Sequence, residues 1–145
     1  MQILAIDPGE LVGWCRAEVV GNFVITDYKD GITPAKLFVE TLHETAGDYD
    51  LIVYETWRLF GSKSRALIGN EMLTSQCIGG IKLCAWVHGV PIIGQGPDIK
   101  KTADKICPEE WKHVIDGESS VHDEAHHVDA FRHLIYYLWR QKHNV

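Results

Sequence analysis

Two short apolar runs that each end in an acidic residue constrain the fold of this chain more than any other feature. Residues 3–6 lead into Asp7 in the stretch "ILAID", and residues 51–54 lead into Glu55 in "LIVYE". Runs of this kind are typical of strands buried on both faces. If the two strands are parallel neighbours, their carboxylates meet at the same edge of the sheet. The Asp-Pro-Gly sequence at 7–9 is also ordinary turn chemistry, so Asp7 alone does not yet indicate a site.

The remaining sequence pattern predicts the element order βββαβαβα. A turn at Gly21-Asn22 and the alternation in "NFVITDY" favour an antiparallel meander ahead of the first helix. Thr33 and Pro34 indicate where that helix begins. We expect a single domain over residues 1–145, of the α/β class, with a mixed five-stranded sheet. The expected elements are strands at 2–7, 11–19, 22–29, 51–55 and 90–94, a helix after residue 34, a long helix at 64–88, two short helices, and a last helix at 122–141.

The distribution of charge tells more than its sum. The chain carries a net charge of −6, with 20 acidic residues against 14 Lys and Arg residues, which argues against a general nucleic-acid-binding surface. Residues 58–105 invert this balance, because they hold seven basic residues against three acidic ones. The local excess fits a phosphate-contacting patch, but on charge alone the solvated faces of ordinary helices explain it better.

Neither a membrane span nor a signal peptide is expected. No apolar stretch approaches 18 residues, and charged residues interrupt the N-terminal segment. The absence of a Cys-x-x-Cys pair favours reduced thiols at all four cysteines, which are Cys15, Cys77, Cys84 and Cys107. These features favour a cytoplasmic location, in the host cytoplasm if the chain is viral.

The last predicted helix carries a narrow stripe of side chains that can bind metals. A turn of about 100° per residue places four of them within an arc of about 60°, namely His122, His126, Asp129 and His133. The stripe is either a solvated polar face or part of a metal site, and Asp and His are poor choices where helix propensity alone decides. The opposite side is apolar and is expected to be the packing face, through Val128, Phe131, Leu134, Ile135 and Leu138.

Ligand chemistry narrows the choice of metal. His122 and His126 have the spacing of the zinc-protease motif H-E-x-x-H, but the segment reads H-D-E-A-H. Glu124 therefore lies about 100° around the helix from the motif position, and a zinc peptidase is not expected. Paired carboxylates such as Asp7 and Glu55 repel each other unless a divalent cation lies between them, and hard oxygen ligands favour magnesium or manganese over zinc.

Three features in order give a family pattern: Asp-Pro-Gly after the first strand, Glu at the end of the fourth, and H-x-x-D in the last helix. In this pattern the chain resembles the RuvC-like Holliday-junction resolvases of the ribonuclease H-like superfamily, over nearly its whole length. The resemblance implies a ribonuclease H-like mixed five-stranded sheet with helices on both faces. The small size and the lack of a targeting signal are compatible with a bacterial or phage member.

The resemblance also implies an activity. It is that of a structure-selective endodeoxyribonuclease that resolves four-way junctions by paired nicks, with two Mg²⁺ or Mn²⁺ ions and no organic cofactor. Two symmetric cuts need two active sites, so a homodimer is implied, with the helix that contains Gly79-Gly80 as its expected interface. Those glycines suit an internal packing contact equally well. The alternatives are another ribonuclease H-like nuclease acting on flaps, RNA–DNA hybrids or structured RNA, and a non-catalytic dimer that binds branched DNA.

The catalytic residues that the resemblance implies can be given by position in this sequence. Asp7, Glu55 and Asp129 match the family's carboxylates, and His126 lies three residues before the last of them. These four residues are the expected metal ligands, although His126 is suited either to ligate a metal or to handle protons. Lys100 matches a functional lysine and is expected to contact the scissile phosphate.

The DNA contacts are expected from basic and aromatic residues around these positions. Trp57 and Phe60 are the candidates for the aromatic residue that the family inserts into the junction. Asp123 has no family equivalent and is well suited to cap the last helix. The full set of expected DNA-binding residues is Arg58, Phe60, Lys63, Arg65, Lys100, Lys101, Lys105 and Lys112.

Overall fold

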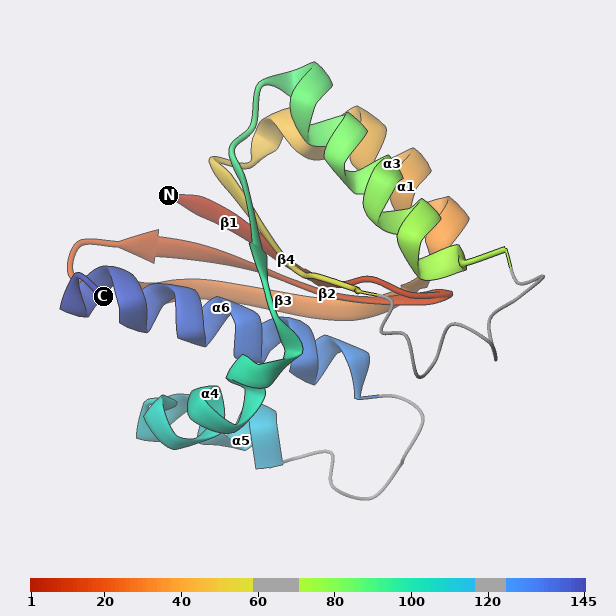
Figure 1. The fold of residues 1–145 in the computed structure, drawn as a ribbon. Coiled ribbons are helices and arrows are strands. Elements are labelled where there is room, and N and C mark those ends of the chain that lie inside the picture. The colour runs from red at the N-terminus through yellow and green to blue at the C-terminus, as the bar shows by residue number, and fades with distance from the viewer. Residues whose placement is uncertain (59–70, 117–124) are drawn as a thin grey trace.

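The fold is built on a five-stranded mixed sheet, seen in a computed structural model that describes residues 1–58, 71–116 and 125–145. The strand order is β3-β2-β1-β4-β5 (Figure 1). β1 pairs antiparallel with β2 and parallel with β4, and β4 pairs parallel with β5. The two acid-ended strands are therefore parallel neighbours, which is the condition for their carboxylates to meet. The strands are β1 Gln2–Asp7, β2 Leu11–Val20, β3 Val24–Pro34, β4 Leu51–Glu55 and β5 Ile92–Gln95.

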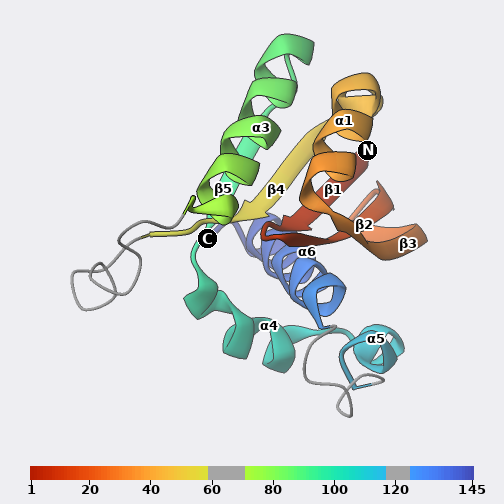
Figure 2. The same ribbon diagram turned by 90° about the vertical axis from the view of Figure 1, so that its right-hand side faces the viewer.

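Helices cover both faces of this sheet (Figures 1 and 2). α1 (Ala35–Thr45) and α3 (Leu73–His88) lie on one face, and α6 (His126–His143) lies on the other. The short helices α4 (Lys100–Ile106) and α5 (Lys112–Asp116) pack against α6. Single turns of 3-10 helix complete the described elements, at η1 Ala46–Asp48, η3 Pro97–Ile99 and η4 Glu109–Trp111.

The alternation of side chains along the central strands divides the core into two layers. Leu4 and Ile6 of β1 pack toward α1 and α3, whereas Ile3 and Ala5 pack toward α6. Because Asp7 continues the second series, its carboxylate lies on the α6 face. In β4, Leu51 and Val53 also pack toward α6, so the same period of two brings Glu55 to that face. The alternation of side chains along the strands thus places both acids on the α6 face, at the carboxyl-terminal ends of β1 and β4.

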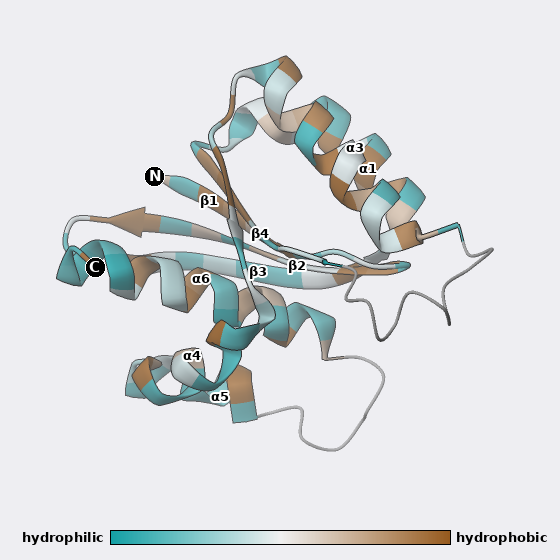
Figure 3. Ribbon diagram, viewed as in Figure 1, coloured by the Kyte–Doolittle hydropathy of each residue, from teal (hydrophilic) through white to brown (hydrophobic). Residues whose placement is uncertain are grey.

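The amphipathic pattern of α6 holds it against the sheet in the expected way. Hydrophilic and hydrophobic bands alternate along this helix (Figure 3). All of the residues expected on its packing face are buried, namely Val128, Phe131, Leu134, Ile135 and Leu138. Of the metal-capable stripe, His126, Asp129 and His133 lie in this helix, and His133 is as deeply buried as the apolar face. His122 lies outside the described residues.

Several element boundaries differ from those expected. The helix expected at 64–88 begins at Leu73, after Met72 adopts the left-handed conformation with φ of 52°. The last helix begins at His126 and follows a turn residue, Ala125. β3 extends to Pro34 because its pairing with β2 continues to Leu11. Residues 64–70 of the expected long helix and the proposed cap Asp123 lie outside the described residues.

The described part of the chain contains no helix long and apolar enough to cross a membrane. All four cysteines are buried free thiols. Burial raises the pKa of the Cys107 thiol to about 11, so this thiol is protonated at neutral pH and poorly reactive.

Candidate active site at the carboxylate edge

The structure brings together the five residues expected to be catalytic. Asp7 ends β1, Glu55 ends β4, and Asp129 lies in the first turn of α6. The Lys100 ammonium lies between two of these carboxylates, with Nζ 2.8 Å from Glu55 Oε2 and 2.7 Å from Asp129 Oδ2. His126 Nδ1 is 2.8 Å from Asp7 Oδ2. The contact between His126 and Asp7 joins residues 119 positions apart in sequence, so distant parts of the chain form one cluster of charges.

Asp7 is the buried member of the cluster, with 6% of its surface exposed. Burial raises the pKa of its carboxyl group, and the negative charges of Glu55 and Asp129 raise it further. The hydrogen bond with His126 and the charge of Lys100 act in the opposite direction but do not cancel the rise. A nearby cation would therefore stabilise the ionised form of Asp7.

Glu55 and Lys100 stabilise each other's charged forms. Burial alone would raise the pKa of Glu55, but hydrogen bonds from His133 and Lys100 lower it overall. Burial alone would lower the pKa of Lys100, but its hydrogen bonds to Asp129 and Glu55 raise it overall. The pair is ionised at neutral pH, and it holds a positive charge at the centre of the site.

Four residues around the cluster were not among the expected site residues. Arg132 Nη1 donates to Asp129 Oδ1 at 2.7 Å, and its Nε donates to Asp104 Oδ1 at 2.7 Å. The His133 ring contacts the side chain of Gln95 through one nitrogen and the carboxylate of Glu55 through the other. The sequence carried a signal for three of them: His133 belongs to the metal-capable stripe of the last helix, Arg132 follows Asp129 by one helical turn, and Gln95 ends an apolar strand as Glu55 does.

A glycine in β2 allows α6 to approach the sheet at this point. Gly13 is the register partner of Asp7. A Cβ atom at Gly13 would lie 2.0 Å from the backbone carbon of His126, which is an impossible distance. The bare backbone of Gly13 therefore sets how closely the first turn of α6 lies to Asp7.

The carboxylates have the right chemistry for a hard divalent cation, although Lys100 lies between two of them. Among the described residues, no three His, Cys, Asp or Glu side chains are gathered as they would be around a metal ion. The oxygens of Asp7, Glu55 and Asp129 are nevertheless the ligands that Mg²⁺ and Mn²⁺ prefer. The mutual repulsion seen in the pKa of Asp7 is what such an ion would relieve.

The residues expected to bind DNA are dispersed. Arg58 is exposed just beyond β4, close to the half-exposed Trp57. Lys101 and Lys105 are exposed on α4, the helix that begins at Lys100. Lys112 forms an ion pair with Glu109 at 2.7 Å and lines a cavity of about 530 Å³ together with Arg132. The expected contacts Phe60, Lys63 and Arg65 lie outside the described residues.

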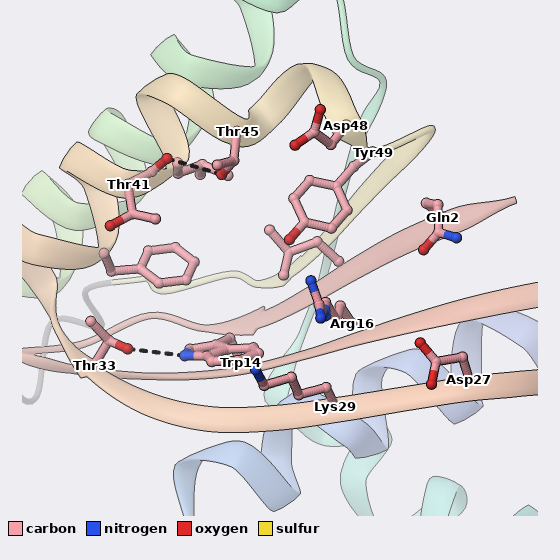
Figure 4. Close-up of a pocket in the computed structure, with 13 residues that line it drawn as sticks. Gln2, Trp14, Arg16, Asp27, Lys29, Thr33, Thr41, Thr45, Asp48 and Tyr49 are labelled. Carbon is pink, nitrogen blue, oxygen red and sulfur yellow. Dashed lines mark hydrogen bonds between the residues drawn. The ribbon is translucent and has the colours of Figure 1, made fainter.

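A second cavity of about 530 Å³ lies away from the carboxylates (Figure 4). It is bounded by α1 and by Trp14 and Arg16 of β2, which alternate with Gly13 and therefore point to the opposite face of the sheet. Trp14 Nε1 donates to Thr33 Oγ1 at 3.0 Å in its wall. This cavity does not belong to the carboxylate site.

Comparison with known proteins gives a match only in solved structures. No family model and no curated protein sequence matches the chain. RuvC of Thermus thermophilus is similar with a TM-score of 0.58 and 20% identity, over 97% of this chain and 96% of RuvC. The fowlpox virus resolvase, solved in complex with Holliday junction DNA, is similar with a TM-score of 0.63 and 15% identity, over 97% of this chain and 99% of the resolvase. The yeast mitochondrial Holliday junction resolvase Ydc2 is similar with a TM-score of 0.63 and 13% identity, over 97% of this chain and 79% of Ydc2.

At these identities the likeness shows the fold. The α/β class, the mixed five-stranded sheet and the ribonuclease H-like arrangement expected from the sequence are confirmed.

Proposed function

From the fold that this chain shares with RuvC and with the viral and mitochondrial resolvases, we propose that it is a structure-selective endodeoxyribonuclease that resolves four-way DNA junctions. The observation that carries the proposal is the convergence of Asp7, Glu55 and Asp129 on one sheet edge, with Lys100 among them. Fold alone does not define a function, but this fold with these groups at its open strand ends supports phosphodiester hydrolysis.

We further propose that the site works with Mg²⁺ or Mn²⁺, held by Asp7, Glu55 and Asp129. If bound there, a pair of such ions would supply an activated water and stabilisation of the leaving oxygen. The support comes from the donor set, which is three carboxylates, and from the raised pKa of Asp7. Loss of cleavage on chelation with EDTA, and its return on addition of Mn²⁺, would test the metal requirement.

The protein groups around the carboxylates suit a polyanionic substrate. The Lys100 side chain is 28% exposed, so its ammonium group can contact a phosphate oxygen while it remains near Glu55 and Asp129. His126 contacts Asp7 through Nδ1, and its side chain is 41% exposed. The other ring nitrogen, Nε2, can take up a proton from water or bind a metal. Arg132 holds Asp129 from the side opposite to Lys100, through the other carboxylate oxygen.

The substrate proposed is branched DNA with four arms. Lys101 and Lys105 are exposed on α4, the helix that begins at Lys100, and the partly exposed Lys112 begins α5. Such exposed cations contribute contacts to the phosphate backbone that do not depend on sequence. Trp57 offers an exposed ring for stacking on an unpaired base.

Paired nicks require two sites, and α3 offers a surface for a second copy of the chain. Gly79, Leu83, Trp86 and Val87 lie on one face of this helix, and the three large side chains are 58%, 66% and 63% exposed. A Cβ atom at Gly79 would meet nothing within 4 Å, whereas one at Gly80 would lie 2.9 Å from Val39 of α1. Gly80 therefore serves internal packing, and the proposed dimer interface is the face around Gly79.

The proposal is tested by cleavage of a labelled four-way junction with Mg²⁺ or Mn²⁺, comparing the wild type with Asp7→Asn. We expect paired symmetric nicks from the wild type. In the variant we expect a loss greater than the roughly 10- to 100-fold that changes outside the direct ligands cost, with junction binding retained. Asp27→Asn, an exposed change on β3, is the matched control and should cut normally.

Two results would contradict the proposal. Equal cutting of flaps or RNA–DNA hybrids would show a nuclease of the same superfamily with another substrate. Junction binding without cleavage by the wild type would show a non-catalytic DNA-binding protein.

A further inference from the structure

His133 is a polar side chain in a place where apolar side chains are the rule. It is fully buried, with 0% of its surface exposed, and its neighbours in α6, Phe131 and Leu134, are equally buried core residues. Placing an imidazole in such surroundings costs free energy unless both ring nitrogens have partners. The sequence alone does not separate this histidine from the other members of its helical stripe.

Both ring nitrogens of His133 have partners, and the two partners end adjacent strands. His133 Nε2 lies 2.9 Å from Glu55 Oε2, and Nδ1 lies 2.8 Å from Gln95 Oε1. Glu55 and Gln95 are register partners in the parallel pairing of β4 with β5. Gln95 is itself buried, with 9% of its surface exposed, and its backbone carbonyl accepts hydrogen bonds from Thr56. The imidazole therefore links the Gln95 side chain, at the end of β5, to the carboxylate of Glu55, at the end of β4.

The direction of the hydrogen bond to Glu55 follows from the chemistry of the groups. An ionised carboxylate only accepts, so Nε2 must carry the proton that is shared with Glu55. Nδ1 then either accepts from the amide group of Gln95, turned so that its nitrogen faces the ring, or donates to its oxygen. In both arrangements Gln95 fixes the ring so that Nε2 points at Glu55.

We propose that His133, held by Gln95, is the positioning residue for the Glu55 carboxylate. This inference rests on the proposed function, in which Glu55 is a metal ligand. His133 and Lys100 both contact Oε2, so Oε1 takes part in neither contact. The imidazole fixes the Glu55 side chain by its contact with Oε2. The fixed carboxylate then offers its remaining lone pairs to a metal ion in a defined direction.

Two amide substitutions separate the two ends of the imidazole. The amide nitrogen of a glutamine in place of His133 reaches about as far as Nε2, whereas that of an asparagine reaches only about as far as Nδ1. We expect His133→Asn to weaken Mn²⁺ binding, measured by electron paramagnetic resonance titration of the DNA-free protein, by roughly 10- to 100-fold. His133→Gln should retain affinity within a few-fold of the wild type. His143→Gln, an exposed change on the same helix, is the control.

The outcomes of this titration decide the proposal. Wild-type affinity in His133→Asn, or equal losses in the asparagine and glutamine variants with melting temperatures unchanged, would overturn it. Junction cleavage measured alongside should follow Mn²⁺ affinity across the series. If the wild type cleaves no junction yet the affinities differ as expected, the positioning role stands and the resolvase proposal fails.

A measurement on the wild type keeps the test independent of variant folding. Long-range proton–nitrogen NMR correlation in the metal-free protein identifies which imidazole nitrogen carries hydrogen. We expect His133 to carry hydrogen on Nε2, with slow exchange. A ring with hydrogen on Nδ1 alone cannot donate to Glu55 and would overturn the proposal whatever the enzyme cuts.

Discussion

At the scale of single residues, Asp7 and Glu55 lie in one site but respond to it in opposite ways. Burial dominates at Asp7 and raises its pKa, whereas hydrogen bonds from His133 and Lys100 overcome burial at Glu55 and lower its pKa. An acid whose pKa is raised by folding destabilises the folded chain once it ionises. An acid whose pKa is lowered contributes stability whenever it is ionised.

These opposite shifts predict opposite effects of neutral substitutions on stability. Asp7→Asn should raise the free energy of unfolding at pH 7, because it removes an ionised group that burial disfavours. Glu55→Gln should lower it, because the contribution of Glu55 is fully present above its unfolded pKa and is lost as pH falls through its lower folded pKa. Urea unfolding of the metal-free proteins from pH 3 to pH 7 would measure both effects. Differences of the same sign at pH 7 would contradict this account.

Gly13 gives a second prediction at this scale, because its missing side chain is what admits α6. Gly13→Ala should destabilise the protein by about 1–3 kcal/mol, the usual cost of overpacking, since the new methyl group overlaps the backbone of His126. It should also reduce cleavage by displacing His126 and Asp129 from Asp7. Thermal unfolding and junction cleavage would measure these effects. Gly21→Ala, where a Cβ atom meets nothing within 4 Å, should leave both unchanged.

At the scale of elements, the sequence predicts the strands well and the helix ends less well. The two apolar runs determine β1 and β4 because a buried parallel strand leaves a local signature of apolar residues. The start of α3 depends on the left-handed turn at Met72, which no propensity rule predicts for that residue. Burial of His133 depends on Gln95 and Glu55, residues 38 and 78 positions away. Such a partnership cannot be read from one helix.

The exposed face of α3 predicts the behaviour of the proposed dimer. Val87→Asp should shift the protein toward monomer by at least about tenfold in dissociation constant, or about 1.4 kcal/mol, because it places a charge in an apolar interface. Sedimentation equilibrium would measure this shift. Val145→Asp is matched in exposure, since both valines are 63% exposed, and it should not change assembly. A monomeric wild type, or equal effects of the two changes, would rule out this interface.

At the scale of the whole molecule, the proposed function requires a chain with a net charge of −6 to bind a polyanion. The acidic groups at the strand ends repel phosphate until cations neutralise them. We expect Ca²⁺ to raise junction affinity by on the order of tenfold at fixed ionic strength. Asp7→Asn should bind more tightly than the wild type without divalent ions, because it lacks one of these charges. Fluorescence anisotropy would measure both, and affinity independent of Ca²⁺ would contradict the expectation.

The position of Lys100 has a consequence for how the protein is made. Because its ammonium lies between Glu55 and Asp129, the site has an internal counter-ion at the moment the chain folds. Folding therefore does not require an inorganic ion, in contrast to the folding of domains whose core is a metal site. Under the proposed function, such a protein could be stored in an inactive, folded form, and the supply of free divalent cation would then decide when it begins to cut.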